Sequence, residues 1–125
     1  MNSRISDEEV SRMSNSEEVL IAWTTIPTSM DGSAFARTLV EDGLAACVSL
    51  YPKGYSTYTW TGKTVVEAES AVMIKTTRLR VDSLEHRILE LHDHDVPEFI
   101  VTNVTDGYPP YLDWVRRAVN EVGPE

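Results

Sequence analysis

The chain has 125 residues, 42% of them hydrophobic, which is enough to build the core of one domain of ordinary size. Its 20 acidic and 11 basic residues give a formal net charge of -9. Because nucleic-acid phosphates and anionic lipids repel such a surface, we expect neither nucleic acid nor a membrane as a partner. The acidity is compatible with cationic partners or metal ions, and equally with a surface that is only well solvated.

Cysteine content and hydropathy indicate the compartment. Cys47 is the only cysteine, so an intramolecular disulfide is excluded and a reducing environment fits best. Residues 1–18 contain no apolar core of a signal peptide, and no segment approaches the roughly 18 consecutive apolar residues of a membrane span. We therefore expect a cytoplasmic protein.

The chain divides into a short tail and one domain. Ser, Glu and Asp dominate residues 1–18, and ordering them would cost more conformational entropy than their contacts return. We predict a flexible acidic tail over residues 1–18 and a folded domain over residues 19–125. The domain begins with the apolar run Val19-Leu20-Ile21-Ala22-Trp23, which predicts a strand that is buried on both faces and ends by Pro27.

The next segments predict a helix, a strand and a long hairpin. Ser29 or Asp31 can cap the helix, and Gly43 can end it. The strands are expected over residues 46–51, 55–60 and 65–76, and a turn at Thr61-Gly62 joins the last two. The hairpin is longer than one small domain needs, so we expect part of it to project and to offer edges for pairing with another subunit.

The second half of the chain predicts a helix, a strand and a further helix. Apolar residues at helical spacing mark residues 79–91, with Thr77 as a cap, and the strand follows over residues 99–104. The last helix starts near Pro110 and ends at Gly123-Pro124. The order β-α-β-β-α-β predicts an α+β fold, a ferredoxin-like sandwich with two helices on one face of an antiparallel sheet, with a long hairpin and an extra C-terminal helix.

The stretch from His92 to Glu98, which reads His-Asp-His-Asp-Val-Pro-Glu, is the densest cluster of metal-ligating residue types in the chain. Imidazole and carboxylate groups suit copper, zinc or nickel. The alternative is a helix end whose histidines interact favourably with the helix dipole, since His92 and His94 would share a face only on an extended segment. The common catalytic motifs, such as GxSxG, Walker A and HExxH, are missing, so we do not expect an enzyme.

Other residues allow two interpretations each. Cys47 lies in an apolar strand, where a cysteine is either a small buried hydrophobe or a soft-metal ligand. Trp60 and its neighbouring aromatic residues suit a subunit interface or a pocket. Lys75 can hold an anion or can simply close a strand in solvent. Tyr111 and Trp114 lie at i, i+3 of the last helix, and we expect them to pack against the sheet.

Five groups of residues, each present once, follow one another along residues 19–119. They are Leu39-Val40-Glu41 with Leu44-Ala45-Ala46-Cys47-Val48, Tyr58-Thr59-Trp60-Thr61-Gly62-Lys63, Ile74-Lys75-Thr76-Thr77, His92 with Val96-Pro97-Glu98, and Tyr111-Leu112-Asp113-Trp114. In this order and spacing they resemble the CutA family of divalent-cation tolerance proteins.

The resemblance implies a homotrimer whose long hairpins pair across subunits. It also implies a non-catalytic, metal-binding role in tolerance to divalent cations, with copper as the first expected metal and zinc as the second. Cys47 and His92 match family positions linked to metal, and with His94 they form the predicted metal ligands. The family's recurrent positions near an interface cleft match Trp60, Lys75, Glu98, Tyr111 and Trp114.

Three departures from the family pattern bear on metal binding. Some members have a cysteine where this chain has Thr24 and a second histidine where it has Leu91. This chain lacks both side chains, which weakens the case that it binds copper with the same ligands as those members. The usual Pro-Tyr after the histidine is Asp93-His94 here, which either supplies compensating ligands or only changes the loop. The alternative function is a PII-like signalling or scaffold trimer that binds a small anion through Lys75.

Overall fold

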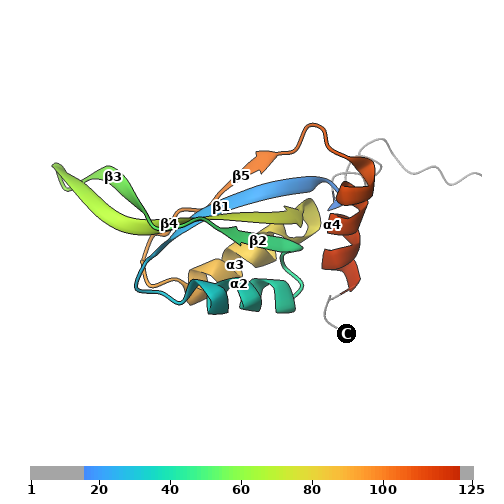
Figure 1. Cartoon of the computed structure of the whole chain (residues 1–125), viewed down its shortest axis with the longest axis horizontal. Coiled ribbons are helices and arrows are strands. Elements are labelled where there is room, and N and C mark those ends of the chain that lie inside the picture. The colour runs from blue at the N-terminus through green and yellow to red at the C-terminus, as the bar shows by residue number, and fades with distance from the viewer. Residues whose placement is uncertain (1–15, 122–125) are drawn as a thin grey trace, which may run out of the picture.

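The computed structural model describes residues 16–121, so residues 1–15 of the predicted tail lie outside the described residues (Figure 1). The strands are β1 (Val19–Pro27), β2 (Cys47–Leu50), β3 (Gly54–Trp60), β4 (Lys63–Thr77) and β5 (Ile100–Asn103). The helices are α2 (Gly32–Glu41), α3 (Val81–Leu91) and α4 (Pro109–Glu121), and the 3-10 turn η1 (Arg78–Arg80) precedes α3.

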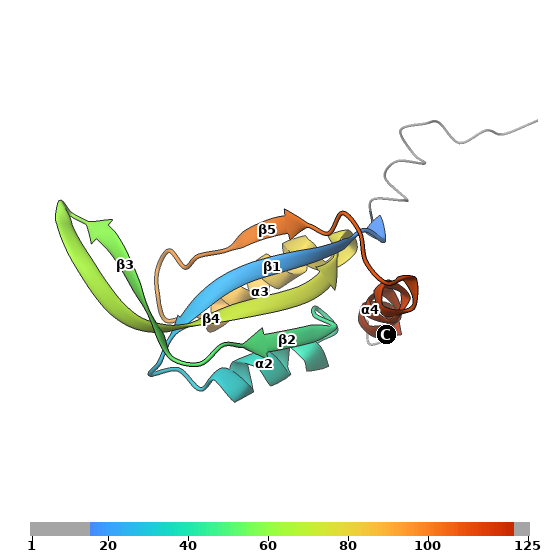
Figure 2. The same ribbon diagram turned by 45° about the horizontal axis from the view of Figure 1, so that its top comes forward.

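All the strand pairs are antiparallel, and the sheet has the order β2-β4-β1-β5 with β3 paired to the outer part of β4. Helices α2 and α3 lie side by side on one face of this sheet, and α4 stands at the end opposite the β3–β4 hairpin (Figures 1 and 2). The arrangement confirms the predicted α+β, ferredoxin-like fold with a long hairpin and an additional C-terminal helix.

The core lies between the sheet and the two helices. Strand β1 alternates, with Ala22, Thr24 and Ile26 buried and Trp23 and Thr25 only half-buried, so the prediction of burial on both faces was wrong for the single chain. The buried residues of β1 and β4 meet Phe35 and Leu39 of α2 and Ile88 of α3. Each such side chain contributes about 1.5–3 kcal/mol through burial.

The ends of α2 follow local sequence signals, whereas the start of α3 does not. Asp31 is the N-cap of α2, where its Oδ1 accepts a hydrogen bond from the Ala34 N–H at 3.1 Å, and Gly43 follows the helix with φ 74°, as predicted. Thr77 does not cap α3, because η1 intervenes and α3 begins after Arg80 without a side-chain cap. Among residues 16–121, the Thr77 hydroxyl is the buried side-chain group without a hydrogen-bond partner.

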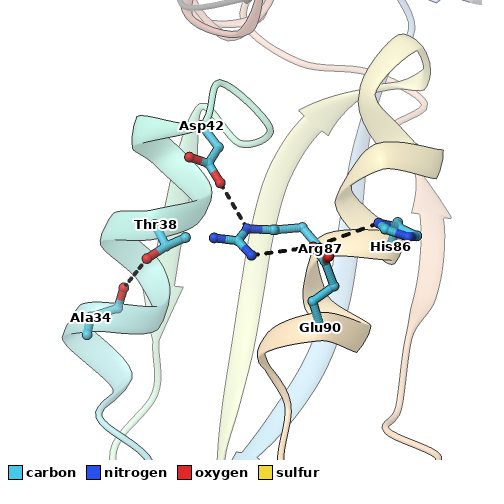
Figure 3. Close-up of polar contacts among 6 residues, drawn as sticks. All are labelled: Ala34, Thr38, Asp42, His86, Arg87 and Glu90. Atoms are coloured by element: carbon cyan, nitrogen blue, oxygen red, sulfur yellow. Dashed lines mark hydrogen bonds and ion pairs between the residues drawn. The ribbon is translucent and has the colours of Figure 1, made fainter.

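Polar contacts join the two helices at their exposed edges (Figure 3). The Arg87 guanidinium donates to Asp42 at 3.0 Å and to Glu90 at 3.3 Å. The hydrogen bond to Asp42, reinforced by the one to Glu90, raises the pKa of Arg87 above the ordinary value of arginine. His86 is exposed beside Glu90, as expected for a surface residue, and such exposed pairs contribute little to stability.

The β3–β4 hairpin projects from the body of the sheet (Figures 1 and 2). Thr61 and Gly62, with φ 48° and 79°, form the two-residue turn, and positive φ at both positions is typical of the type I′ turns that suit twisted hairpins. Strand β1 pairs with β4 only from Glu69 onward, whereas β3 pairs with β4 from Lys63 to Glu69. Among the strands that the structure describes, residues 63–68 of β4 therefore have a neighbour on one side only.

Helix α4 packs against the end of the sheet through Val115 and Val119, both fully buried. Arg80 fixes its last turn, because Nε and Nη2 both donate to the Val119 carbonyl, at 3.2 and 2.9 Å. Tyr111 and Trp114 are each 41% exposed and lie against one another with ring centroids 5.6 Å apart. Neither ring belongs to the cluster of Val115, Val119 and Leu112 through which the helix packs on the sheet, so the prediction that these two rings pack against the sheet was wrong for the single chain.

Candidate functional site

A cleft of about 1020 Å³ opens between the β3–β4 hairpin and the loop that joins α3 to β5. Its charged lining residues are all acidic: Glu67, Glu69, Asp93, Asp95 and Glu98. His94 lies among them, and none of the described residues that line the cleft is Lys or Arg. Low-dielectric walls that carry one sign of charge focus the field, so this cleft concentrates cations.

The hairpin contributes the two carboxylates of the cleft floor. Glu67 and Glu69 stand two positions apart on β4, which places both side chains on one face of the strand. The Tyr58 hydroxyl of β3 donates to Glu67 Oε2 at 2.7 Å across the hairpin. This hydrogen bond, together with the charges of both glutamates, raises the pKa of Tyr58, so the phenol stays protonated as a donor through the neutral range.

The loop after α3 contributes the imidazole. His92, the C-cap of α3, is 8% exposed, and its Nε2 lies 2.7 Å from the Thr25 carbonyl while its Nδ1 accepts the His94 N–H at 3.0 Å. Because Nδ1 accepts this bond, Nε2 is the ring nitrogen that can donate to the Thr25 carbonyl. His94 is held by this bond and by ring contact with His92, and its Nε2 lies 3.4 Å from Glu67 Oε1.

One ligand atom from each of Glu67, Glu69 and His94 lies within 4.8 Å of the other two. Glu69 is only 9% exposed, and no described residue forms a hydrogen bond or ion pair with its carboxylate. Two carboxylates and one imidazole from two separate segments thus converge on one point. This is a donor set that suits a divalent transition-metal ion.

The residues predicted as metal ligands do not form one site within a subunit. Cys47 pairs with Lys75 on β4, and its Sγ lies 3.9 Å from Lys75 Nζ. Lys75 stands eight positions from Glu67, or roughly 26 Å along the strand. His92 has both ring nitrogens bonded within the chain, so of the predicted ligands only His94 presents a ring nitrogen to the group at the cleft.

The predicted cleft residues are also divided. Trp60 and Glu98 line the cleft, and Trp60 is 63% exposed. Lys75 lies beside Cys47, away from the lining. Tyr111 and Trp114 belong to α4, at the opposite end of the molecule from the hairpin (Figure 1). The single chain therefore does not bring all five residues into one cleft.

Glu67 and Glu69 were not predicted from the sequence. The available signal was their alternation along a strand, Glu67-Ala68-Glu69, which places two carboxylates on one face. This signal was weak, because exposed acidic residues are common in a chain with 20 of them. Only the path of the loop from His92 to Glu98 brings an imidazole to the pair.

The same order of segments is found in a known family. The family model for the CutA1 divalent ion tolerance protein matches residues 20–118. The chain belongs to the CutA1 family. This confirms the family resemblance stated from the sequence.

Individual relatives agree with this assignment. The chain is 37% identical over 100 residues to the divalent-cation tolerance protein CutA of Thermus thermophilus, covering 80% of this chain and 95% of that protein. It is 32% identical over 102 residues to protein CutA 1, chloroplastic, of Oryza sativa, covering 82% of this chain but 58% of the rice protein. The chain thus spans little more than half the length of that CutA1 relative.

Solved structures of the family share the fold. The crystal structure of CutA from Xylella fastidiosa matches with a TM-score of 0.79 at 34% identity, covering 82% of this chain and 98% of that one. Within residues 16–121, no helix is both long and apolar enough to cross a membrane.

Proposed function

We propose that the chain is a non-catalytic, homotrimeric metal-binding protein that contributes to tolerance of divalent cations in the cytoplasm. The observation that carries this proposal is the acidic cleft, in which carboxylates and His94 gather without Lys or Arg. Carboxylate oxygens and an imidazole nitrogen together suit copper(II) and zinc. The name of the family and that of the Thermus relative, a divalent-cation tolerance protein, point to the same class of ligand.

The charge of the cleft disfavours the alternative of an anion-binding signalling trimer. An anion would approach carboxylates of Glu67, Glu69 and three further acidic residues, and like charges in a partly enclosed cleft repel. The cation proposed for anion binding, Lys75, lies beside Cys47 and outside this lining.

The open edges of the hairpin support the trimer. Residues 63–68 of β4 have no strand partner on one side, and an unpaired edge of this kind is satisfied by a strand from another copy of the chain. Tyr55 and Trp60 of the hairpin are 79% and 63% exposed, as suits residues that become buried between subunits. Assembly would also supply the interface cleft near which the family resemblance places Trp60, Lys75, Glu98, Tyr111 and Trp114.

Calorimetric titration of the full-length, tag-free chain with Cu²⁺ and with Zn²⁺ tests metal binding. We expect saturable binding of both ions, and Mg²⁺ serves as the control because it prefers all-oxygen, largely hydrated sites. If neither transition metal binds at micromolar concentration, the proposed function is wrong.

A further inference from the structure

We propose that Glu67, Glu69 and His94 bind one divalent transition-metal ion at the base of the hairpin. This inference rests on the proposed function and assigns the ion to three defined side chains within the acidic cleft. It differs from the ligand set expected from the sequence, in which Cys47, His92 and His94 were the ligands.

Glu69 is largely buried and has no hydrogen-bond donor among the described residues. Its side chain is nine-tenths buried at the junction where β1 and β3 both reach β4, opposite Pro27 on one side and Gly54 on the other. No described residue donates a hydrogen bond to its carboxylate, and Glu67 places a second negative charge beside it. Two like charges held close together, one of them on a largely buried side chain, repel each other, and a cation bound between the two carboxylates removes that penalty.

The three side chains are close enough together to bind one ion. The ligand atoms of the three residues lie within 4.8 Å of one another. Zinc binds nitrogen and oxygen ligands at about 2.0–2.2 Å in a tetrahedron, so two of its ligands are about 3.3–3.6 Å apart. Side-chain rotations that shorten the longest separation by about 1.2–1.5 Å complete the site. The backbone of the hairpin and the loop need not move.

Neighbouring groups orient two of the three ligands. Tyr58 occupies Oε2 of Glu67 and so leaves Oε1, the atom nearest His94 Nε2, for the ion. His92 fixes the backbone of His94 by accepting its N–H. Hydrogen bonds of this kind, from groups that do not themselves touch the ion, hold ligands in place in metal sites.

The donor set selects the class of metal. One imidazole and two carboxylates suit zinc, copper(II) or nickel, whereas magnesium and calcium prefer oxygen ligands alone. Copper(I) prefers thiolate and thioether ligands, and no Cys or Met lines this cleft among the described residues. Three protein ligands leave a coordination position open to water or to a further ligand.

Variants of the full-length chain test the assignment by Zn²⁺ calorimetry after metal has been removed with a chelator. We expect Glu69→Gln and His94→Ala each to weaken Zn²⁺ binding about tenfold or more. Glu98→Gln is the matched control, because it removes the same charge from the same cleft outside the three-residue group. His86→Ala controls for the loss of an exposed histidine. Glu98→Gln should weaken Zn²⁺ binding clearly less than Glu69→Gln does, because it removes a charge of the cleft but no ligand, and His86→Ala should bind Zn²⁺ within about twofold of the wild type.

The outcomes separate this inference from the proposed function. If the wild type binds zinc and Glu69→Gln weakens binding no more than Glu98→Gln does, the acidic cleft attracts cations without this site, and the inference is wrong while the proposed function stands. If the wild type binds neither zinc nor copper, the proposed function itself is wrong.

Electron paramagnetic resonance of the Cu²⁺-loaded protein provides a readout that a merely destabilised variant would not change. We expect nitrogen hyperfine coupling from one imidazole in the wild type and in His86→Ala, and its loss in His94→Ala. Retention of the coupling in His94→Ala would show that the imidazole comes from another residue and would overturn the assignment.

Discussion

Glu69 is the one acidic residue with a buried side chain among those the structure describes, and the like charge of Glu67 lies beside it. In chelator-treated protein we expect Glu69→Gln to raise the free energy of unfolding by roughly 1 kcal/mol, because a neutral amide is easier to bury than an unpaired carboxylate. Urea unfolding measures the change. Glu98→Gln, at an exposed position, should have little effect. A loss of stability in Glu69→Gln would mean that the carboxylate has a favourable partner.

Tyr58 is a positioning residue, because it orients the carboxylate of Glu67. Its hydroxyl donates to Oε2 at 2.7 Å, and removing the donor in Tyr58→Phe leaves the carboxylate free to rotate away from His94. We expect zinc affinity to fall about tenfold, which is the lower range for losing a group that orients a metal ligand. Tyr55→Phe, on the same strand and 79% exposed, is the matched control. Equal affinity in the two variants would contradict a positioning role.

Residue-level reasoning from the sequence found only one of the three proposed ligands. His94 was named because it lies in a dense run of ligand types, whereas Glu67 lies 27 positions earlier in an ordinary acidic strand. Their approach depends on the register of the hairpin and on the loop that His92 anchors to Thr25. Neither contact between distant segments leaves a local pattern in the sequence.

At the scale of elements, positions with strong local chemistry were predicted well. Asp31 and Gly43 mark the ends of α2 through a cap and a positive φ, and Thr61-Gly62 forms the predicted turn. Thr77 failed as a cap because the chain makes a 3-10 turn before α3, which its side chain does not signal. The ends of elements can therefore be predicted from the sequence where a single residue sets them, and less well where packing sets them.

The hairpin turn contains a residue that does not suit its backbone. Thr61 has φ 48°, and a β-branched residue is strained in this region, whereas asparagine tolerates it. We expect Thr61→Asn to raise the free energy of unfolding by about 0.5–1 kcal/mol, measured by thermal or urea unfolding. Thr59→Asn, in the adjacent strand, should instead be neutral or destabilising. A less stable Thr61→Asn would show that the Thr61 hydroxyl bond to the Trp60 carbonyl outweighs the strain.

At the scale of the whole molecule, the projecting hairpin and its unpaired edge favour assembly. We expect sedimentation velocity at micromolar concentration to give three times the 14.0 kDa mass of the chain. The physical reason is that residues 63–68 of β4 gain a partner strand and the exposed aromatic residues of the hairpin become buried. Sedimentation as a monomer at this concentration would refute the trimer.

The central claim, that the base of the hairpin holds a divalent metal, is tested most directly by anomalous diffraction from crystals soaked in zinc. The account predicts one strong anomalous peak per subunit, within about 2.0–2.2 Å of carboxylate oxygens of Glu67 and Glu69 and of a ring nitrogen of His94. A peak at Cys47 instead, with nothing between these three side chains, would contradict it.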